Sequence, residues 1–273
     1  MAQAQAKPKG RVLIIAGSDS GGGAGIQADI KTVTALGGYA MTAITAVTVQ
    51  NTIGVTNVHE IPPNIVREQI EAVMGDLGAD AWKLGMLGSA AHARTVLEAW
   101  HAVGASVPVV LDPVMIAKSG ASLLAEDAVA VIRDELMPIA ALVTPNAPEA
   151  EALTGVEVRG LDGQMDAAEV LVEQLGAYAA LVKGGHVEGD VVRDVLLTRA
   201  GYRVFESPRM ATRATHGTGC TLASAIAAHI AQGAAIEPAV EKARAYLIEA
   251  IRHAPGLGQG HGPLGHNWPL KLA

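Results

Sequence analysis

The chain has 273 residues, half of them hydrophobic, and its 20 basic and 27 acidic residues give a net charge of −7. This length suits one large α/β domain or two smaller ones. The acidic balance and the aromatic content of 3% argue against a nucleic-acid partner, which requires clustered positive charge and stacking platforms. No uncharged apolar run is long enough to span a bilayer, so no membrane partner is expected.

The first ten residues are polar and lack the apolar stretch of a secretory signal. We therefore expect residues 1–10 to be disordered. No change of composition in the rest of the chain resembles a linker, so residues 11–273 are predicted to form a single domain. The single cysteine excludes an intramolecular disulfide and is compatible with a reducing compartment, so a cytoplasmic protein is expected.

From residue 11 onward, short apolar runs alternate with segments of helical spacing. Strands are predicted at residues 11–16, 40–49, 81–84, 107–111, 141–144 and 179–183. Helices are predicted at residues 26–36, 62–74, 90–103, 125–136, 147–153, 165–175, from about 218 to Gly233, and 238–253. Residues 191–198 and 202–206 are predicted to pair as a hairpin. The pattern predicts a three-layer α/β/α fold with a mainly parallel central sheet, helices on both faces and an antiparallel edge.

In such sheets, ligands bind beyond the carboxyl ends of the strands. The residues of chemical interest fall at these ends: residues 17–25, Gly85-Met86, Asp112, residues 146–149 and residues 183–186. We therefore expect them to line one site.

The stretch Ala214-Thr-His-Gly-Thr-Gly-Cys-Thr221 reads as a glycine-bearing turn that leads into a helix. A helix start carries unpaired N–H groups and a positive dipole end, so Gly217, Thr218 and Gly219 could cradle an anion. Cys220 falls in the first turn, where the thiolate is favoured. A buried cysteine behind an ordinary turn explains the same pattern, and so does a nucleophilic cysteine paired with His216.

The first loop contains Gly23-Ala-Gly-Ile-Gln-Ala28, which fits the G-x-G-x-x-A pattern of dinucleotide-binding folds. The acidic residue expected about twenty positions later is missing, and no P-loop follows. Nicotinamide binding and the P-loop class are thus disfavoured. What remains is a backbone that can approach a small ligand closely, with Asp29 one turn into the helix.

Asn146 and Glu149 stand one helical turn apart and offer oxygen donors of the kind that Mg²⁺ prefers. Helix capping explains this spacing too, and is the commoner cause in isolation. Asp112 could act through its charge or cap its own loop. Lys183, at a strand end, could meet a phosphate or be a solvated lysine.

The tail at residues 258–266 contains two histidines, but no H-E-x-x-H spacing or cysteine partner supports a zinc site. Together, the anion-binding turn, the magnesium-type oxygen donors, the strand-end lysine and the glycine-lined loop indicate phosphoryl transfer. That chemistry depends mainly on positioning and charge neutralisation.

Eight blocks, in order, resemble the hydroxymethylpyrimidine/phosphomethylpyrimidine kinases of thiamine biosynthesis, which belong to the ribokinase-like superfamily. They are AGSDSGGGAGIQADIKT, TAVTVQNT, KLGMLGS, LDPVMIAKSG, TPNAPEAEALTG, LVKGGH, HGTGCTLASAIAA and GHGPLGH, from about residue 11 to 266. The resemblance implies a homodimer and two steps that use ATP and Mg²⁺. The first phosphorylates the hydroxymethyl group of 4-amino-5-hydroxymethyl-2-methylpyrimidine, and the second converts that monophosphate to the diphosphate.

The resemblance also implies roles for individual residues around the pyrimidine. Gln50 would hydrogen-bond the ring, because a primary amide both donates and accepts. Asp29 and the backbone at Gly17 would complete the polar recognition. Met86 and Val114 would sandwich the ring.

The remaining roles concern the phosphoryl group. Cys220 would be the base near the substrate hydroxyl, and the amides of Gly217, Thr218, Gly219 and Cys220 would form an anion hole. By the same resemblance, Asp112 and Glu149 would hold Mg²⁺ through water. Asp112, Asn146 and Lys183 would lie on the nucleotide side, with Lys183 facing the phosphates.

The chain departs from related patterns at three positions. Ribokinase-like sugar kinases usually carry aspartate where Cys220 stands, so the thiol indicates the pyrimidine branch. Val49 replaces a residue that is often alanine. Arg244 replaces an expected lysine and keeps the charge but not the shape.

Three alternatives remain at this point. A pyridoxal or pyridoxine kinase of the same fold is the nearest, although Gln50 and Cys220 argue against it. A non-catalytic pyrimidine-binding regulator is disfavoured, because a binder needs neither metal ligands nor Lys183. A nicotinamide dehydrogenase is weakened by the missing acidic residue.

Overall fold

The computed structural model describes residues 10–103, 106–115 and 126–270. Within these ranges, one nine-stranded sheet has the order β3-β2-β1-β4-β5-β6-β7-β8-β9. Its strands are β1 Arg11–Asp19, β2 Tyr39–Gln50, β3 Val55–Glu60, β4 Ala81–Leu84, β5 Val109–Leu111, β6 Ala140–Val143, β7 Ala180–Val182, β8 Val191–Thr198 and β9 Gly201–Pro208. The α-helices are α1 Gly25–Ala35, α2 Pro63–Asp76, α3 Ala90–Ala102, α4 Glu126–Val131, α5 Ala147–Thr154, α6 Leu161–Glu169, α7 Thr218–Ala231 and α8 Ile236–Arg252.

The sheet is parallel from β2 through β7 and antiparallel at both edges. The predicted hairpin forms one edge, where β8 pairs antiparallel with β7 and with β9. At the other edge β3 pairs antiparallel with β2. The predicted three-layer fold with an antiparallel edge is confirmed, and the second antiparallel edge is an addition that the pattern did not indicate.

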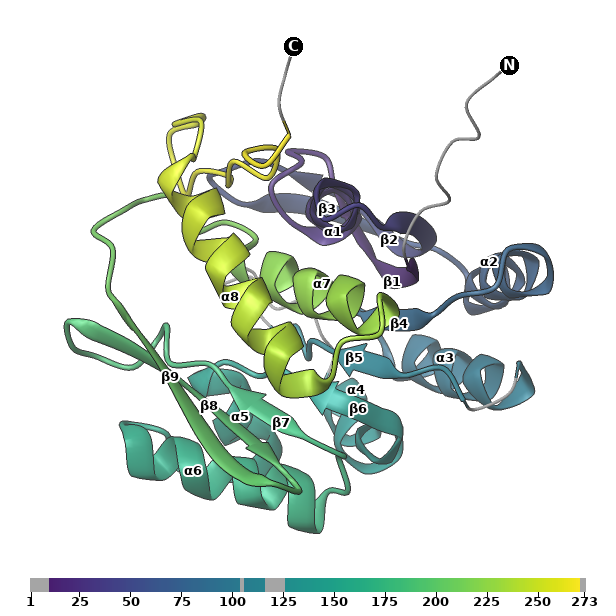
Figure 1. The fold of residues 1–273 in the computed structure, drawn as a ribbon. Coiled ribbons are helices and arrows are strands. Elements are labelled where there is room, and N and C mark those ends of the chain that lie inside the picture. The colour runs from purple at the N-terminus through teal and green to yellow at the C-terminus, as the bar shows by residue number, and fades with distance from the viewer. Residues whose placement is uncertain (1–9, 104–105, 116–125, 271–273) are drawn as a thin grey trace, which may run out of the picture.

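The two faces of the sheet bury two separate cores, because successive side chains of a strand point in opposite directions. In β1, Val12 and Ile14 pack with α1, α7 and α8. Leu13 and Ile15 face the other side and pack with α2, α3 and the helices that follow them up to α6. Figure 1 shows α1, α7 and α8 together over one face of the sheet. The strand ends are thereby held between two helical layers.

Two predicted helices differ in their limits and regularity. The helix predicted at 165–175 begins earlier, at Leu161, and ends in a π-helical turn, Val170–Gln174. The helix predicted at 125–136 is α4 followed by a second π-helical turn, Ile132–Leu136. Residue 125 and residues 1–9 of the predicted disordered segment lie outside the described ranges. Within the described ranges, no helix is long and apolar enough to cross a membrane.

The segment after α8 returns over the loop that precedes α7. The backbone N–H of Gly262 donates to the carbonyl of Arg213, and that of His216 donates to the carbonyl of Gly262. The N–H of His261 donates to the carbonyl of Thr52, beyond the end of β2. The tail therefore ties the turn before α7 to the loop between β2 and β3, and so helps to wall in the strand ends.

His266 anchors this tail from inside the protein. Its ring lies 2.9 Å from the Thr221 hydroxyl, its side chain and backbone are 4% exposed, and its carbonyl accepts from the Tyr246 hydroxyl. Burial, assisted by the positive charge of Lys31, lowers the pKa of His266 to about 4. The imidazole is therefore neutral in the folded chain at neutral pH.

We expect this buried histidine to make the fold sensitive to acid. Because its folded pKa lies below the ordinary 6.5, neutral His266 stabilises the fold above pH 6.5, and this is lost as the pH falls toward 4. The loss amounts to about 3 kcal/mol. Denaturant unfolding at several pH values should show a steeper decline for the wild type than for His266→Gln, which can still hydrogen-bond Thr221. Parallel curves for the two proteins would contradict the prediction.

Candidate active site

The predicted site residues gather at the carboxyl ends of the parallel strands. Gly17 lies in β1 near its end, Gln50 ends β2, and Met86 follows β4. Asp112 follows β5, and an isolated parallel bridge joins Asn146 to Lys183 beyond β6 and β7. The sheet has a switch point between β1 and β4. From β1 the chain continues to β2 and β3 on one side of the sheet, whereas β4 and all later strands lie on the other side. A crevice at such a switch point is the usual place for a ligand.

Glycines let the two loops at this edge pack backbone against backbone. A Cβ atom built on Gly217, whose φ is +78°, would lie 1.9 Å from the carbonyl oxygen of Gly23. A Cβ on Gly25 would lie 2.4 Å from the carbonyl oxygen of Gly17. No side chain fits at either position. The turn before α7 is thus locked against the first glycine-rich loop.

The start of α7 faces two charged side chains. A Cβ built on Gly219 would lie 3.3 Å from Nζ of Lys183 and 3.5 Å from Oδ2 of Asp112. Lys183 in turn lies 3.0 Å from Oδ1 of Asp112 and 4.0 Å from Oε2 of Glu149. The structure therefore brings the predicted anion turn, the lysine and both carboxylates together.

This cluster holds two carboxylates for one ammonium group. Burial opposes the charge of Lys183, but Asp112 and Glu149 outweigh it and raise its pKa. Burial also raises the pKa of Glu149 to about 7, although Lys183 acts in the opposite direction. The cluster is thus short of positive charge, and an arriving cation would be stabilised there.

Asn146 and Glu149 form the capping box that the spacing allowed. The Asn146 side chain accepts from the Glu149 N–H at 3.0 Å, and Glu149 Oε2 accepts from the Asn146 N–H at 2.8 Å. Capping occupies Oε2 only, so Glu149 Oε1 keeps its lone pairs. Capping and a metal-linked role are compatible here.

The donor set fits Mg²⁺ shared with phosphates. In the described part of the chain, no group of three or more Asp, Glu, His or Cys side chains could hold a metal ion by itself. Two buried carboxylates, Asp112 and Glu149, nevertheless supply hard oxygen donors beside a phosphate-type lysine. Mg²⁺ commonly binds through one or two carboxylates and keeps several waters.

Lys83 and Asp29 form a wholly buried ion pair near Cys220, and the sequence did not indicate this pair. Nζ of Lys83, in β4, lies 2.9 Å from Oδ2 of Asp29, and both side chains are 0% exposed. The hydroxyl of Ser224, one turn after Cys220 in α7, donates to Oδ1 of Asp29 at 2.7 Å. Both carboxylate oxygens are therefore engaged within the protein, and contact between Asp29 and a substrate stays a prediction. A lysine inside the apolar run Ala81–Leu84 was the signal of a buried partner.

The electrostatics around Cys220 do not favour the thiolate that a helix start could stabilise. Burial raises the pKa of the thiol to about 12, because the desolvated anion is disfavoured. Lys83 lowers the pKa, while Asp29 and Asp112 raise it. Desolvation and the neighbouring carboxylates outweigh Lys83 and the hydrogen bond with the Gly25 backbone, so the thiol carries its proton at neutral pH.

Met86 and Gly17 form a close-packed wall on the other side of the site. A Cβ on Gly17 would lie 2.2 Å from Cε of Met86, so the methionine lies directly on the strand backbone. The hydroxyl of Thr45 donates to the Met86 carbonyl at 2.7 Å and fixes this turn. Val114, two residues after Asp112, is half-buried. Whether Met86 and Val114 enclose a ring stays a prediction.

Asp19 and His216 are two further residues of this site whose pairing the sequence did not indicate. Oδ2 of Asp19 lies 2.8 Å from Nε2 of His216, and Gln50 lies next to the pair. The rival pairing of His216 with Cys220 is not what the structure favours, since the ring of His216 is directed to Asp19. An aspartate at the end of a buried strand, shortly before a run of glycines, was the available signal.

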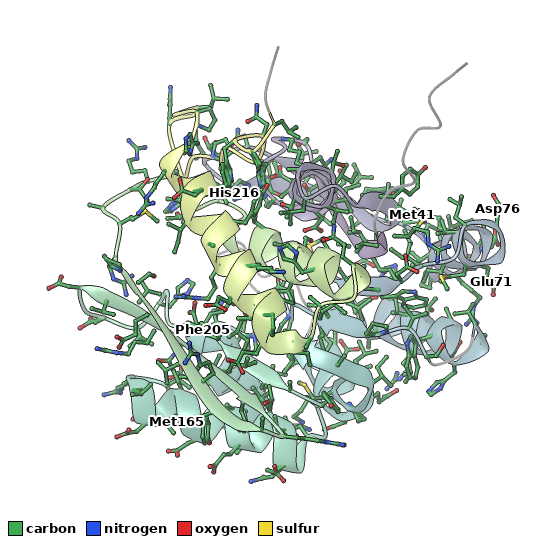
Figure 2. The ribbon with its side chains drawn as sticks, in the orientation of Figure 1. Met41, Glu71, Asp76, Met165, Phe205 and His216 are labelled. Carbon is green, nitrogen blue, oxygen red and sulfur yellow. The ribbon has the colours of Figure 1, made fainter. Side chains whose placement is uncertain are left out.

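Arg244 is a structural residue. Its guanidinium donates to Oδ2 of Asp194 at 2.7 Å and packs 5.4 Å from the ring centre of Phe205, a residue of β9 (Figure 2). Asp194 also accepts from the N–H of Gly184, directly after Lys183. Through Asp194, Arg244 therefore helps to fix the loop that follows Lys183.

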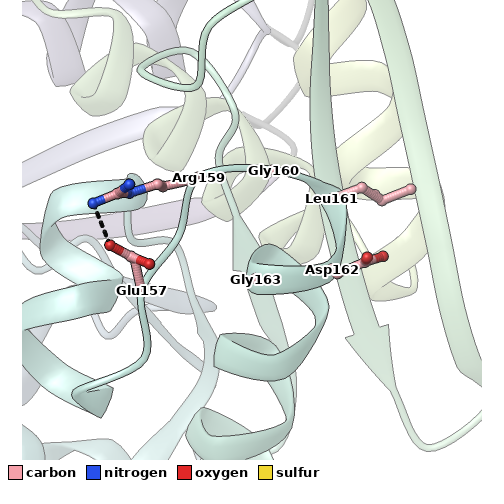
Figure 3. A pocket seen from close by; sticks show the side chains of 6 residues that line it. All are labelled: Glu157, Arg159, Gly160, Leu161, Asp162 and Gly163. Carbon is pink, nitrogen blue, oxygen red and sulfur yellow. Dashed lines mark ion pairs between the residues drawn. The ribbon is translucent and has the colours of Figure 1, made fainter.

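A separate surface depression lies at the start of α6 and contains none of these residues (Figure 3). Its volume is about 370 Å³, and its lining includes the exposed ion pair between Glu157 and Arg159. Because its lining includes none of the strand-end residues, we assign the chemistry to the strand ends.

Comparison with known structures defines the class of protein. The chain is 34% identical to a pyridoxal kinase from Bacillus subtilis solved as an ADP complex, with a TM-score of 0.87 over 94% of this chain and 97% of that one. It is 41% identical to a phosphomethylpyrimidine kinase from Clostridium difficile, with a TM-score of 0.79 over 89% of this chain and 100% of that one. The fold is that of a ribokinase-like small-molecule kinase.

Sequence comparison identifies the family. The model of the phosphomethylpyrimidine kinase family matches residues 19–265, and the chain belongs to this family. It is 47% identical over 257 residues to the hydroxymethylpyrimidine/phosphomethylpyrimidine kinase of Bacillus subtilis, with 94% of each chain covered. It is 49% identical over 266 residues to a thiamine biosynthesis bifunctional protein of Geobacter sulfurreducens. That match covers 95% of this chain and 52% of the relative, so the chain spans about half its length.

We expect the thiol of Cys220 to titrate far above its ordinary range. Because it is the only cysteine, the ultraviolet absorbance of the wild-type chain minus that of Cys220→Ala reports this thiolate alone, once both proteins show the same circular dichroism. The difference should rise only above about pH 10, since burial raises the pKa to about 12. A midpoint at or below the ordinary value of about 8.5 would contradict the prediction.

Proposed function

We propose that this protein uses ATP to phosphorylate 4-amino-5-hydroxymethyl-2-methylpyrimidine to its monophosphate and then to its diphosphate, in thiamine diphosphate biosynthesis. The observation that carries the proposal is the meeting of Gly219, Lys183 and Asp112 directly beside Cys220. It supplies an anion-binding helix start, a phosphate-type cation and a metal-type carboxylate at one point. Family membership and the names of the relatives support the same reaction.

The phosphoryl group would move across the start of α7. The amides of Gly217, Thr218, Gly219 and Cys220 would stabilise its charge, because a helix start presents unpaired N–H groups. Lys183, held 3.0 Å from Asp112, would face the nucleotide phosphates as a point charge. Asn146 caps α5 and is joined to Lys183 by an isolated β-bridge, so it would also lie on the nucleotide side.

Asp112 and Glu149 would hold Mg²⁺ through water beside these phosphates. Bound Mg²⁺ supplies positive charge that neutralises the phosphate oxygens. The carboxylates themselves orient that charge toward the start of α7, where Gly219 faces Asp112.

The pyrimidine would bind between the two glycine loops. Gln50 would hydrogen-bond its polar edge, the backbone at Gly17 would add a further contact, and Met86 and Val114 would pack on its faces. Asp29, whose oxygens are taken by Lys83 and Ser224, would contribute mainly by holding Lys83 in place.

Cys220 would take the proton of the substrate hydroxyl in the first step. A thiol whose pKa is about 12 is protonated at neutral pH, so it becomes a base only when bound cationic charge lowers that pKa. Lys83 already acts in this direction. The phosphate nucleophile of the second step is ionised at neutral pH and has no such proton to lose.

A pyridoxal kinase activity is the second candidate. It is favoured by one observation, the TM-score of 0.87 to the pyridoxal kinase of Bacillus subtilis. We rank it lower because sequence identity is higher to the pyrimidine kinases, at 47% against 34%.

We also propose that the protein is a cytoplasmic homodimer. Apolar side chains lie exposed along β2, β3 and their connecting loop: Val47, Val49, Ile53 and Val58. An exposed apolar strand pair of this kind is typical of a covered surface. Sedimentation as a monomer would contradict the dimer. The single cysteine, which is compatible with a reducing compartment, supports the cytoplasmic placement.

The proposed function predicts selective phosphorylation of the pyrimidine. With ATP and Mg²⁺, purified protein should convert hydroxymethylpyrimidine to the monophosphate and then to the diphosphate, resolved by chromatography. Pyridoxal, assayed in parallel, should react with a kcat/KM at least about tenfold lower, because it lacks the aminopyrimidine edge. Absence of pyrimidine products would refute the proposal, and a monophosphate that never advances would remove the second step.

The base role predicts that Cys220→Ala harms the two steps unequally. The first phosphorylation should lose about a hundredfold in kcat, a typical value for a lost general base, and the second less than about tenfold. Single-turnover assays that start from the pyrimidine or from its monophosphate measure each step. Cys220→Ser serves as the matched control for shape. Equal losses in both steps would assign Cys220 a positional role.

A further inference from the structure

Lys83 carries a positive charge into the layer between the sheet and α1 and α7. In β4 it is in register with Ile14 of β1, whose side chain belongs to the core on the side of α1, α7 and α8. The lysine side chain is 0% exposed, so only neighbouring protein groups can compensate its charge. Burial opposes this charge, but Asp29, Cys220 and Asp112 outweigh it and raise the pKa of the ammonium group. Lys83 is therefore a buried cation that acts on more than one acidic neighbour.

Two contacts, one helical turn apart, join α1 to α7 beside this lysine. The hydroxyl of Ser224 donates to Oδ1 of Asp29 at 2.7 Å. One turn earlier in both helices, Sγ of Cys220 is hydrogen-bonded to the backbone N–H of Gly25. Residues four apart lie on the same face of a helix, so the thiol and the pair of Asp29 with Lys83 lie in the same contact between the two helices.

Three charged side chains act on Sγ of Cys220. Desolvation disfavours the anionic form of the thiol most strongly, Asp29 and Asp112 add to this effect, and Lys83 opposes it. Of these three side chains, Lys83 alone would stabilise a thiolate. Nζ of Lys83 lies 2.9 Å from Oδ2 of Asp29. The carboxylate therefore fixes the ammonium group near the thiol and at the same time offsets part of its charge.

We propose that Lys83 is the counter-ion of the thiolate that Cys220 forms in the first phosphorylation, and that Asp29 fixes the ammonium group in the position that this requires. The inference rests on the proposed function, in which Cys220 takes the proton of the substrate hydroxyl. The thiol first releases its own proton to solvent. The thiolate then accepts the hydroxyl proton, while the substrate oxygen bonds to the γ-phosphorus of ATP and ADP leaves. Because Lys83 is wholly buried, it acts through Cys220 and is a positioning residue. The second phosphorylation starts from an ionised phosphate and needs no thiolate.

Two substitutions in the ion pair should move the titration of Cys220 in opposite directions. Because Cys220 is the only cysteine, the ultraviolet absorbance of each protein minus that of the same protein with Cys220→Ala reports its thiolate, without any substrate. Asp29→Asn removes an anion and leaves Lys83 to the thiolate, so the midpoint should fall by about one pH unit or more. Lys83→Met removes the cation, so little thiolate should form at the pH where half of the wild-type thiol is ionised. Loss of the ion pair as such would affect both variants alike, so opposite shifts report charge and not packing.

Lys83→Met should also harm the two phosphorylations unequally. The kcat of the first step should fall about tenfold or more, since each pH unit by which the thiol titrates higher leaves tenfold less thiolate. The kcat of the second step should fall less than about threefold, and single-turnover assays from the pyrimidine or its monophosphate separate the two. Arg244→Met is the matched control, because it breaks another buried ion pair, with Asp194, between α8 and β8. It should leave the titration of Cys220 unchanged and lower both steps to the same extent.

The outcomes distinguish this inference from the proposed function. If Lys83→Met does not fold, the double variant Lys83→Met/Asp29→Asn, which buries no lone charge, should show the same selective loss of the first step. An unmoved midpoint in folded Asp29→Asn, shifts of both single variants in the same direction, or equal losses in the two steps without Lys83 would overturn the inference. If the wild type makes no pyrimidine phosphate, the proposed function fails, while the titration, which needs no substrate, still decides whether Lys83 acts on the thiolate.

Discussion

The ion pair between Lys83 and Asp29 is the interaction on which the position of the active site depends. Both side chains are wholly buried, so each charge is compensated by the other and not by water. Removal of one partner from such a pair leaves a desolvated charge, at a typical cost of about 3–5 kcal/mol. The pair joins β4 to α1, and Ser224 joins it to α7. Because Ser224 follows Cys220 by one helical turn, the same contacts fix where the thiol lies relative to the strand ends.

The architecture of this site follows from features that a sequence displays. Buried strands appear as continuous apolar runs, and parallel strands end at one edge, so residues directly after them must converge. Gly17, Met86, Asp112, Asn146 and Lys183 all follow from this rule. The edge strand β3 does not, because nearly all of its residues are exposed and it has no apolar face to create a pattern. β3 is defined by its antiparallel pairing with β2, and its own residues do not indicate that pairing.

What the sequence could not predict are the partners and the electrostatic balance. Lys83 and Asp29 are separated by 54 residues, and Asp19 and His216 by 197, so only the folded chain brings them together. The state of Cys220 depends on the folded chain for a related reason. A helix start favours a thiolate, but desolvation together with Asp29 and Asp112, which come from distant parts of the chain, raises the pKa of the thiol to about 12. The sequence therefore indicated which chemical groups gather at the strand ends, but it did not indicate which residues surround them.

Desolvation also sets the charge state of two groups in the candidate site. The pKa of the Cys220 thiol is raised to about 12, so the thiol keeps its proton at neutral pH, and the pKa of Glu149 is raised to about 7, so part of its population is neutral near physiological pH. Each shift arises mainly from desolvation, which disfavours the charged form, and nearby positive charge opposes it. In the proposed reaction, a bound cation would therefore shift both groups toward their anionic forms.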